Sequence, residues 1–208
     1  MKTLILPALA LLAFALPAKA ETSAPMTVAT VGRAAPDFKG KDTNGKEQTL
    51  SQYKGKIVVL EWTNPDCPYV HKHYESGNMQ SLQKEALAQD VVWLTVASSA
   101  IGKEGYYGAA ESNKWMVDNK SAPTARLMDP TGVIGHLYGA KTTPHMFVVN
   151  PEGTLVYSGA IDDNDSFKQE TISGAKNYVR EAIKSIKAGT PVEVATTKAY
   201  GCSVKYDN

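Results

Sequence analysis

The sequence contains few cysteines: Cys67 and Cys202 are the only two in 208 residues. Neither lies next to the apolar run at the N-terminus, where a lipoprotein-type cleavage site would need one. This absence argues against a lipid anchor at that place. In an oxidising compartment, an even count of two permits a single disulfide.

The sequence also lacks an excess of charge of either sign, with 22 Lys and Arg residues against 21 Asp and Glu residues. Removal of the first twenty residues takes away two lysines, which changes the net charge from +1 to −1. The sequence contains no basic patch of the kind that would indicate nucleic-acid binding. The chain shows no internal repeat, and its length and 43% hydrophobic composition suit one globular domain with a substantial core.

The first twenty residues differ from the rest. Lys2 precedes an apolar run over residues 4–16, and Ala18-Lys19-Ala20 forms a small-x-small cleavage site. This pattern predicts a secretory signal peptide over residues 1–20, too short and wrongly flanked for a spanning helix. We therefore expect a secreted or periplasmic protein without stable membrane insertion after cleavage, and an uncleaved anchor is the alternative. Residues 21–31 are small and polar, which predicts a flexible leader.

Cys67 lies where a strand gives way to a helix. Four apolar residues, 57–60, predict a strand buried on both faces of a parallel sheet, and Pro68 is tolerated only in the first turn of a helix. Cys67 is therefore expected at a helix N-terminus, whose partial positive charge and free N–H groups favour a nucleophilic thiolate. The alternative is a buried, inert cysteine.

Periodicity and turn signals predict the other elements. They are a hairpin over 38–50, a core strand at 56–62, a helix from 68 that breaks at 76–78 and resumes at 79–88, a strand at 91–97, a helix at 109–119, a strand at 125–128, a helix at 130–138, a hairpin of strands 145–150 and 154–159, and an amphipathic helix at 167–187. The order predicts an α/β fold: a mixed sheet flanked by helices, with an N-terminal β-hairpin and a C-terminal tail, 188–208, that carries Cys202. The alternating Cys, Val and Tyr residues of the tail are compatible with an added strand.

Several motifs resemble a known superfamily. Cys67-Pro68-Tyr69 at a strand-to-helix turn resembles the active-site turn of thioredoxins and glutaredoxins, with Val70 in place of their second cysteine. Residues 32–38 (GRAAPDF) and 50–56 (LSQYKGK) resemble the opening of redoxin-domain proteins, the peroxiredoxin and thiol-disulfide oxidoreductase superfamily. The resemblance covers residues 32–187 and implies a thioredoxin-like fold. Together with the GCSVKY segment near the end, the cysteine motif is similar to a subgroup of exported redoxin-domain proteins.

The resemblance also implies a substrate-binding site. Thr143-Pro144 precedes a strand, where the resembled fold has a cis proline opposite the active-site cysteine, although local sequence alone favours a trans proline. The backbone of Thr143 would then pair with a bound thiol substrate as a short strand does. Trp62 and Pro68 complete the candidate substrate-binding residues.

Residues around the thiol bear on peroxide reduction. Peroxiredoxins carry a Thr or Ser three residues before the reactive cysteine, where this chain has Asn64, and Thr63 stands one position earlier as a candidate modulator. His71 is the other candidate modulator, because it lies one helical turn after Cys67 and a protonated imidazole there would favour the thiolate; the alternative is plain surface exposure. Lys72 and His73 are predicted to form a solvated face.

Cys202 has three interpretations. In the first, it is a resolving cysteine that attacks an oxidised Cys67. In the second, it is the structural partner of Cys67 in a permanent disulfide, and in the third both cysteines are free thiols. Because Val70 leaves Cys67 without a neighbouring resolving thiol, we expect Cys202 within bonding reach of Cys67 in at least one redox state.

The leading hypothesis is an exported thiol oxidoreductase with Cys67 as nucleophile, acting on a protein thiol or disulfide or on a peroxide, and regenerated by an external thiol reductant. The alternatives are a true peroxidase, a non-catalytic binding domain of the same fold, and a copper-binding or metal-assembly module using Cys67 and His71. No cofactor and no metal ligand set is expected.

Overall fold

The computed structural model describes residues 28–207. The expected signal peptide, 1–20, and most of the expected leader lie outside the described residues. Residues 28–31 already pack onto the domain, because the N–H of Ala29 donates to Leu137 O at 2.9 Å and Val31 packs against the core. The folded domain therefore begins slightly before residue 32.

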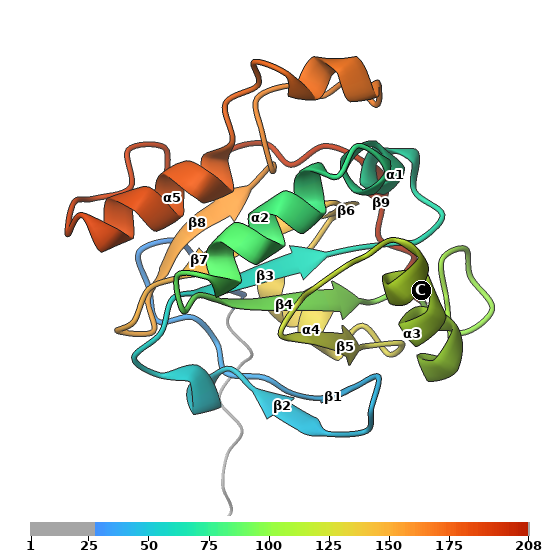
Figure 1. Cartoon of the computed structure of the whole chain (residues 1–208). Coiled ribbons are helices and arrows are strands. Elements are labelled where there is room, and N and C mark those ends of the chain that lie inside the picture. The colour runs from blue at the N-terminus through green and yellow to red at the C-terminus, as the bar shows by residue number, and fades with distance from the viewer. Residues whose placement is uncertain (1–27, 208) are drawn as a thin grey trace, which may run out of the picture.

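The centre of the described chain is a seven-stranded mixed sheet with the order β2-β1-β5-β4-β3-β7-β8, and a separate two-stranded sheet pairs β6 with β9 (Figure 1). The core strands β3, β4 and β5 are parallel, and β7, β8 and β1 are antiparallel to their neighbours. The strands are β1 (Lys39–Asp42), β2 (Glu47–Thr49), β3 (Val58–Trp62), β4 (Val92–Ala97), β5 (Ala125–Met128), β6 (Thr142–Thr143), β7 (His145–Val149), β8 (Leu155–Gly159) and β9 (Cys202–Ser203).

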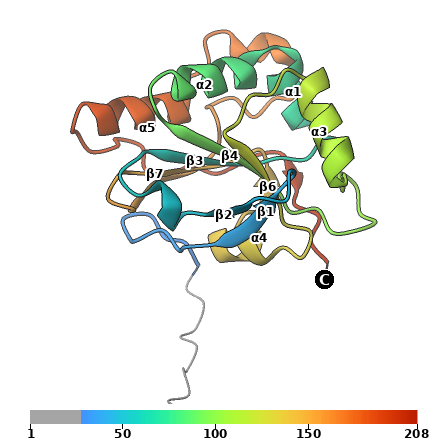
Figure 2. The same ribbon diagram turned by 60° about the horizontal axis from the view of Figure 1, so that its bottom comes forward.

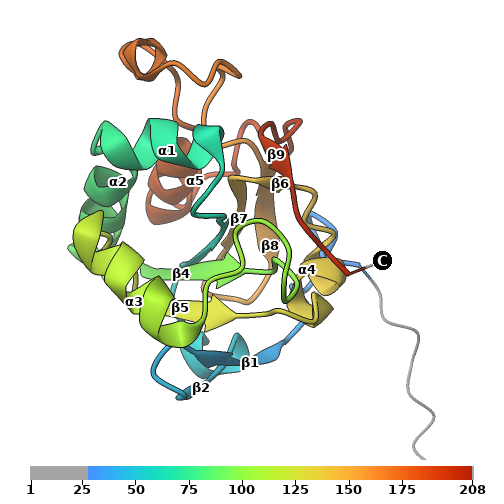
Figure 3. The same cartoon turned by 90° about the vertical axis from the view of Figure 1, so that its right-hand side faces the viewer.

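Helices cover both faces of this sheet. The helices are α1 (Pro68–Glu75), α2 (Asn78–Leu87), α3 (Ala109–Asp118), α4 (Val133–Tyr138) and α5 (Tyr178–Lys187), with short 3-10 turns at Ser51–Tyr53 and Gln169–Ile172. Helices α1, α2, α3 and α5 lie on one face and α4 on the other (Figures 2 and 3). No helix within residues 28–207 is both long and apolar enough to cross a bilayer.

The sheet separates two apolar cores because successive side chains of a strand point to opposite faces. In β3, Val59 joins the core beneath α1, α2 and α5, whereas Leu60 and Trp62 join the core beneath α4. All five residues of β3 are buried, as expected for a central strand covered on both faces. Cys67 belongs to the first core. The mixed sheet, both hairpins and the helix break around Gly77 confirm the predicted arrangement.

The predicted helix over 167–187 is wrong in its first half. The helix begins only at Tyr178, and the preceding segment holds a 3-10 turn and Gly174 at φ +89°. Asn177 caps the helix by accepting the N–H of Arg180 at 2.9 Å. The apolar spacing of Ile172 and Ala175 imitates a helical face, but the positive φ of Gly174 interrupts the helix geometry before the cap.

Candidate active site

The turn before α1 holds Cys67 in place. Cys67 is the N-cap residue of α1, Pro68 follows in the first turn, and the Cys67 side chain is fully buried. The side chain of Asn64 accepts the N–H of Asp66 at 2.8 Å, and the Asp66 carboxylate accepts Gly105 N–H and Tyr107 Oη–H, both at 2.9 Å. The loop before α3 therefore braces the turn from outside.

The proline predicted opposite the thiol is present. The Thr143-Pro144 bond is cis. The Cys67 thiol donates a hydrogen bond to the carbonyl oxygen of Thr143, with a sulfur–oxygen distance of 3.1 Å. Both features confirm the expectation from the family resemblance.

The tail places Cys202 directly on Cys67. Strand β9 lies beside β6 (Figure 3) and pairs antiparallel with it, with Cys202 opposite Thr143. The two sulfur atoms lie 2.7 Å apart. Both residues are free thiols in this structure. The expected approach of Cys202 to Cys67 is therefore confirmed, and the tail occupies the edge where a substrate strand was expected.

The position before Cys202 requires a glycine. Gly201 has φ +130°, and a Cβ there would collide with the carbonyl group of Thr143. Any side chain at this position would push β9 away from β6.

The protonation of Cys202 is shifted by its surroundings. Burial raises the pKa of the Cys202 thiol to about 12, and the hydrogen bond and charge of Cys67 act in the same direction. Cys202 is thus a neutral thiol at physiological pH as long as Cys67 stays beside it.

The histidines after the cysteine do not behave alike. His71 is exposed, and its two ring nitrogens contact Glu75 Oε1 at 2.8 Å and Pro65 O at 2.6 Å, not a thiol. The prediction that Lys72 and His73 form a solvated face is wrong: their exposed fractions are 1% and 0%. The face of α1 that they occupy is covered by the tail and by the loop after β8.

Lys72 and His73 belong to a buried cluster around the ring of Tyr200. The Tyr200 hydroxyl donates to Asp162 Oδ1 and lies 3.3 Å from His73 Nε2, and Lys72 Nζ lies 5.5 Å from the ring centroid. Tyr69 packs on the ring at 5.8 Å between centroids. We call Tyr69, Lys72, His73 and Asp162 the Tyr200 seat. No local sequence signal reveals this cluster, because Tyr200 lies outside the two-residue strand β9 and is 127 residues from His73.

Charge in the Tyr200 seat is balanced inside the protein. Lys72 Nζ donates to Asn164 O at 2.9 Å and lies 4.0 Å from Asp162 Oδ2. Burial lowers the pKa of His73 to about 3, and the charge of Lys72 adds to this. Burial also raises the pKa of Asp162, while the hydrogen bond from Tyr200 opposes that shift. His73 is therefore neutral at physiological pH.

The other predicted site residues lie around the thiols at different depths. Trp62 is fully buried in the core on the opposite face of the sheet and donates to Ser98 Oγ at 3.0 Å. Pro68 is exposed beside Cys67. Thr63 is buried, and its hydroxyl has no hydrogen-bond partner among residues 28–207. The structure thus brings together Cys67, Cys202, Thr143 and Pro144, and it places Trp62 apart from them.

A buried polar network under α1 was not predicted. Glu61, fully buried, accepts Trp93 Nε1–H at 2.7 Å and Tyr74 Oη–H at 2.8 Å. Burial raises the pKa of Glu61, and these hydrogen bonds oppose the shift. Tyr74 and Trp93 share the core cluster of Cys67, so the network supports the same helix.

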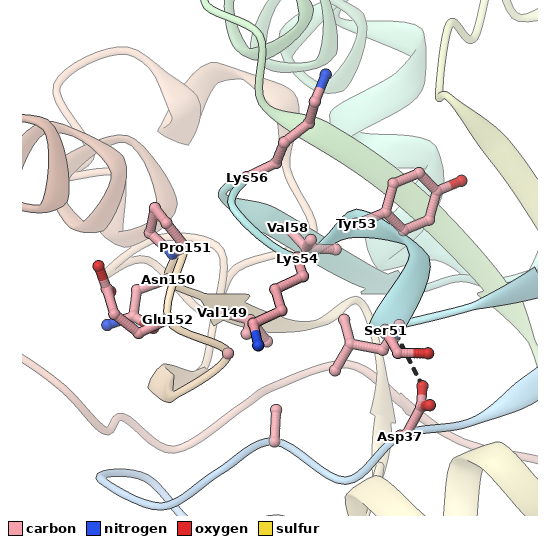
Figure 4. A pocket seen from close by; sticks show the side chains of 13 residues that line it. Asp37, Ser51, Tyr53, Lys54, Lys56, Val58, Val149, Asn150, Pro151 and Glu152 are labelled. Atoms are coloured by element: carbon pink, nitrogen blue, oxygen red, sulfur yellow. Dashed lines mark hydrogen bonds between the residues drawn. The ribbon is translucent and has the colours of Figure 1, made fainter.

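A cavity of about 140 Å³ lies at the opposite end of β3, between residues before that strand and the β7–β8 turn (Figure 4). It includes Lys56 and Val58, and Asp37 at its rim accepts the N–H of Ser51. The cavity is separate from the thiols. Among the described residues, no three His, Cys, Asp or Glu side chains gather in a way that could hold a metal ion.

Comparison with known proteins finds a relative that is named for thiol chemistry. Thiol-disulfide oxidoreductase ResA of Bacillus subtilis (strain 168) is 28% identical over 132 residues, which is 60% of this chain. The match spans 64% of that relative, slightly under two thirds of its length.

Solved structures share the fold. A hypothetical protein, SMc02350, from Sinorhizobium meliloti 1021 superposes with a TM-score of 0.72 at 20% identity, covering 87% of this chain and 97% of that one. The exposed lipoprotein thioredoxin Etrx1 from Streptococcus pneumoniae strain TIGR4 gives 0.51 at 25% identity, with 74% and 99% covered. These neighbours show that the mixed sheet is thioredoxin-like. The AhpC/TSA family model matches residues 31–158, more than half of the sequence, so the chain belongs to the AhpC/TSA family.

Proposed function

We propose that this protein is an exported thiol oxidoreductase in which Cys67 and Cys202 form the redox pair of a thiol-disulfide exchange reaction. The observation that carries the proposal is the 2.7 Å separation of the two sulfur atoms, with β9 paired to β6. A disulfide needs a sulfur–sulfur distance of about 2.05 Å, so a small shift suffices to form the bond. The apolar N-terminal segment supports export.

The exchange runs in two steps. The thiolate of Cys67 attacks a substrate disulfide, forms a mixed disulfide and releases one substrate thiolate, which takes up a proton. The thiolate of Cys202 then attacks the Cys67 sulfur and releases the second substrate thiolate, which is protonated in turn. Two electrons and two protons have moved from the protein to the substrate. An external dithiol reverses the change in the protein by reducing the Cys67–Cys202 disulfide.

The environment of Cys202 orders these steps. Two of the effects that raise the pKa of Cys202 come from Cys67, through its hydrogen bond and its charge. Burial is the largest effect that raises this pKa, and it persists. The two effects of Cys67 disappear once Cys67 is bound in a mixed disulfide, so the pKa of Cys202 is then lower than in the dithiol. Cys202 stays protonated beforehand and leaves the first attack to Cys67.

A disulfide is favoured over a peroxide as the substrate. Asn64 replaces the hydroxyl residue that the peroxiredoxin pattern requires, and its side-chain amide oxygen accepts the N–H of Asp66. The neighbouring hydroxyl of Thr63 is buried. The name of the ResA relative points to the same chemistry.

The decisive experiment compares wild type with the Cys67→Ser and Cys202→Ser variants. Each reduced protein is mixed with glutathione disulfide or hydrogen peroxide, and the products are mapped by non-reducing peptide mass spectrometry. We expect wild type to form a Cys67–Cys202 peptide with glutathione disulfide, and Cys202→Ser to stop as a Cys67–glutathione adduct. Cys67→Ser should form neither product.

Two outcomes would count against the proposal. If wild type yields no Cys67–Cys202 peptide with either oxidant, the two-cysteine mechanism is wrong. If hydrogen peroxide oxidises Cys67 much faster than glutathione disulfide does, the protein is a peroxidase instead.

A further inference from the structure

The tail is held by a tyrosine on each side of Cys202, and the two tyrosines bind in different ways. Tyr206 stacks on His136 at 4.1 Å between centroids, and its hydroxyl donates to the neutral carbonyl oxygen of Ala140 at 2.8 Å. Tyr200 instead donates to the carboxylate of Asp162, inside the Tyr200 seat. A hydrogen bond to a charged group contributes roughly twice as much as one between neutral groups.

The Tyr200 seat is built from side chains that depend on the tail for their cover. Lys72, His73 and Asp162 are exposed by 1%, 0% and 2%. His73 Nδ1 is engaged by the Asn78 side chain at 2.8 Å, which turns Nε2 toward the Tyr200 hydroxyl. If Tyr200 moves out of the Tyr200 seat, Asp162 loses the hydrogen bond from the tyrosine hydroxyl, and the buried side chains of the seat are exposed to water. A buried charge without its hydrogen bonds is costly, so the seat favours the docked tail.

The docked tail also controls access to Cys67. The Cys67 side chain is 0% exposed, with Cys202 at its sulfur and Gly201 against Thr143. A reagent or substrate reaches this sulfur only after β9 moves away from β6. Tyr200 is two residues from Cys202, so the bond that keeps Tyr200 in its seat also resists this movement.

We propose that Tyr200 is a positioning residue for the redox pair: its hydrogen bond to Asp162 keeps Cys202 on Cys67, favours the internal disulfide and closes Cys67 to outside reagents. This inference rests on the proposed function of the two cysteines. The bond concerned is the Cys67–Cys202 disulfide, which forms when two glutathione thiols are produced from one glutathione disulfide and breaks in the reverse reaction.

The test compares Tyr200→Phe with Tyr206→Phe, two full-length variants that each lose one tyrosine hydroxyl from the same tail. The first measurement is the equilibrium constant between the internal disulfide and glutathione. The hydrogen bond to the Asp162 carboxylate is already present in the dithiol form, so its loss acts on the disulfide only through the docked fraction of reduced molecules. We therefore expect Tyr200→Phe to weaken the internal disulfide about twofold. Tyr206→Phe should leave it nearly unchanged, since its acceptor is neutral.

The second measurement is the rate at which iodoacetamide alkylates Cys67 in the Cys202→Ser background. Adding Tyr200→Phe should raise this rate about tenfold or more, and adding Tyr206→Phe should leave it nearly unchanged. Asp162→Asn provides an independent variant, because it removes the charge of the acceptor and keeps a hydrogen-bonding oxygen. It should shift both quantities in the same direction as Tyr200→Phe, by a smaller factor.

Equal effects of Tyr200→Phe and Tyr206→Phe on both quantities would overturn the inference, because the two hydroxyls would then act only as general tail contacts. Unchanged values in both Tyr200→Phe and Asp162→Asn would overturn it as well. Failure of the proposed function looks different: wild type itself would then form no internal disulfide with glutathione disulfide.

Discussion

His145 follows the cis proline and lies in β7 opposite Trp62. Its side chain is buried, its Nδ1 accepts the N–H of Lys141 at 3.2 Å, and its ring lies 4.4 Å from that of Phe147. Burial lowers the pKa of His145 to about 4, and the charge of Lys141 adds to this. The imidazole is therefore neutral in the folded protein at a pH where an exposed histidine is half protonated.

The pKa of His145 predicts a loss of stability in acid. The unfolded chain binds a proton at His145 near pH 6.5 and the folded chain only near pH 4. Between these two pH values the unfolded state therefore holds more protons than the folded state. The contribution of His145 to the stability of the folded protein is intact above about pH 6.5 and is lost progressively as the pH falls toward 4. His145→Asn keeps an acceptor for Lys141 and removes the titration.

Urea unfolding between pH 7 and pH 4.5 measures this effect. The free energy of unfolding should fall less steeply with decreasing pH in His145→Asn than in wild type. The slope of this free energy against pH should differ between the two proteins by an amount equivalent to up to about one bound proton. Identical slopes in the two proteins would show that His145 is not the group responsible.

Single residues differ in how far sequence could predict them. Cys67 was placed correctly because it stands in a local strand-to-helix motif, and Cys202 because it is one of only two cysteines. The cis Pro144 followed from the family resemblance, since local sequence alone favours a trans proline. Lys72 and His73 were misplaced because charged side chains on a helix are usually solvated, and nothing nearby in the sequence reveals Asp162 or Tyr200. Their burial is decided by contacts across about ninety and more residues of chain.

At the scale of elements, α5 depends on its cap. Asn177 accepts the N–H of Arg180 and is 8% exposed, so water does not easily replace this bond. We expect Asn177→Ala to lower the free energy of unfolding by about 1 kcal/mol, and Asn177→Ser to lower it much less because serine is also a good cap. Equilibrium unfolding in urea of the three proteins is the measurement, and an Asn177→Ala variant as stable as wild type would contradict the role of the cap.

The same cap explains the limit of sequence reasoning for α5. Apolar spacing continues through residues 172–186 without a visible break, so periodicity alone extends the helix too far toward its N-terminus. By contrast, the break between α1 and α2 was predictable, because Gly77 with a flanking Asn78 is a strong local signal. Strand β9 was expected only as an option, since two residues carry little periodicity.

For the whole molecule, oxidation should raise thermal stability. A Cys67–Cys202 bond joins residues that are 135 positions apart. Closing a loop of more than a hundred residues stabilises the folded state by up to about 4–5 kcal/mol in the chain-entropy model. For a protein of this size each 1 kcal/mol corresponds to about 2–4 °C in Tm.

Calorimetry with and without a reductant tests this expectation. Oxidised wild type should melt several degrees above reduced wild type, and reduced Cys202→Ser should melt close to reduced wild type. The Cys202→Ser variant also serves as the control, because a reductant should not change its Tm. An oxidised form that melts at or below the reduced form would mean that the bond strains the fold.

The overall architecture was the most predictable level. A buried strand, a break at Pro68 and alternating strands and helices already indicate parallel strands with helices on both faces. The location of the tail was not determined by such patterns, because its path depends on where Tyr200 and Tyr206 find partners. Those partners lie in the loop after β8 and around α4, far from the tail in sequence.

The strand β9 is tethered to the same chain as the edge that it covers. Dilution therefore cannot remove it, and its local concentration at β6 is set by the length of the tail and not by the amount of protein. An outside segment that binds β6 competes with this fixed local concentration. Its apparent affinity equals its intrinsic affinity multiplied by the fraction of molecules whose tail is open. A short free peptide should consequently compete poorly, whereas a partner with further contacts on the surface around the site can offset the difference.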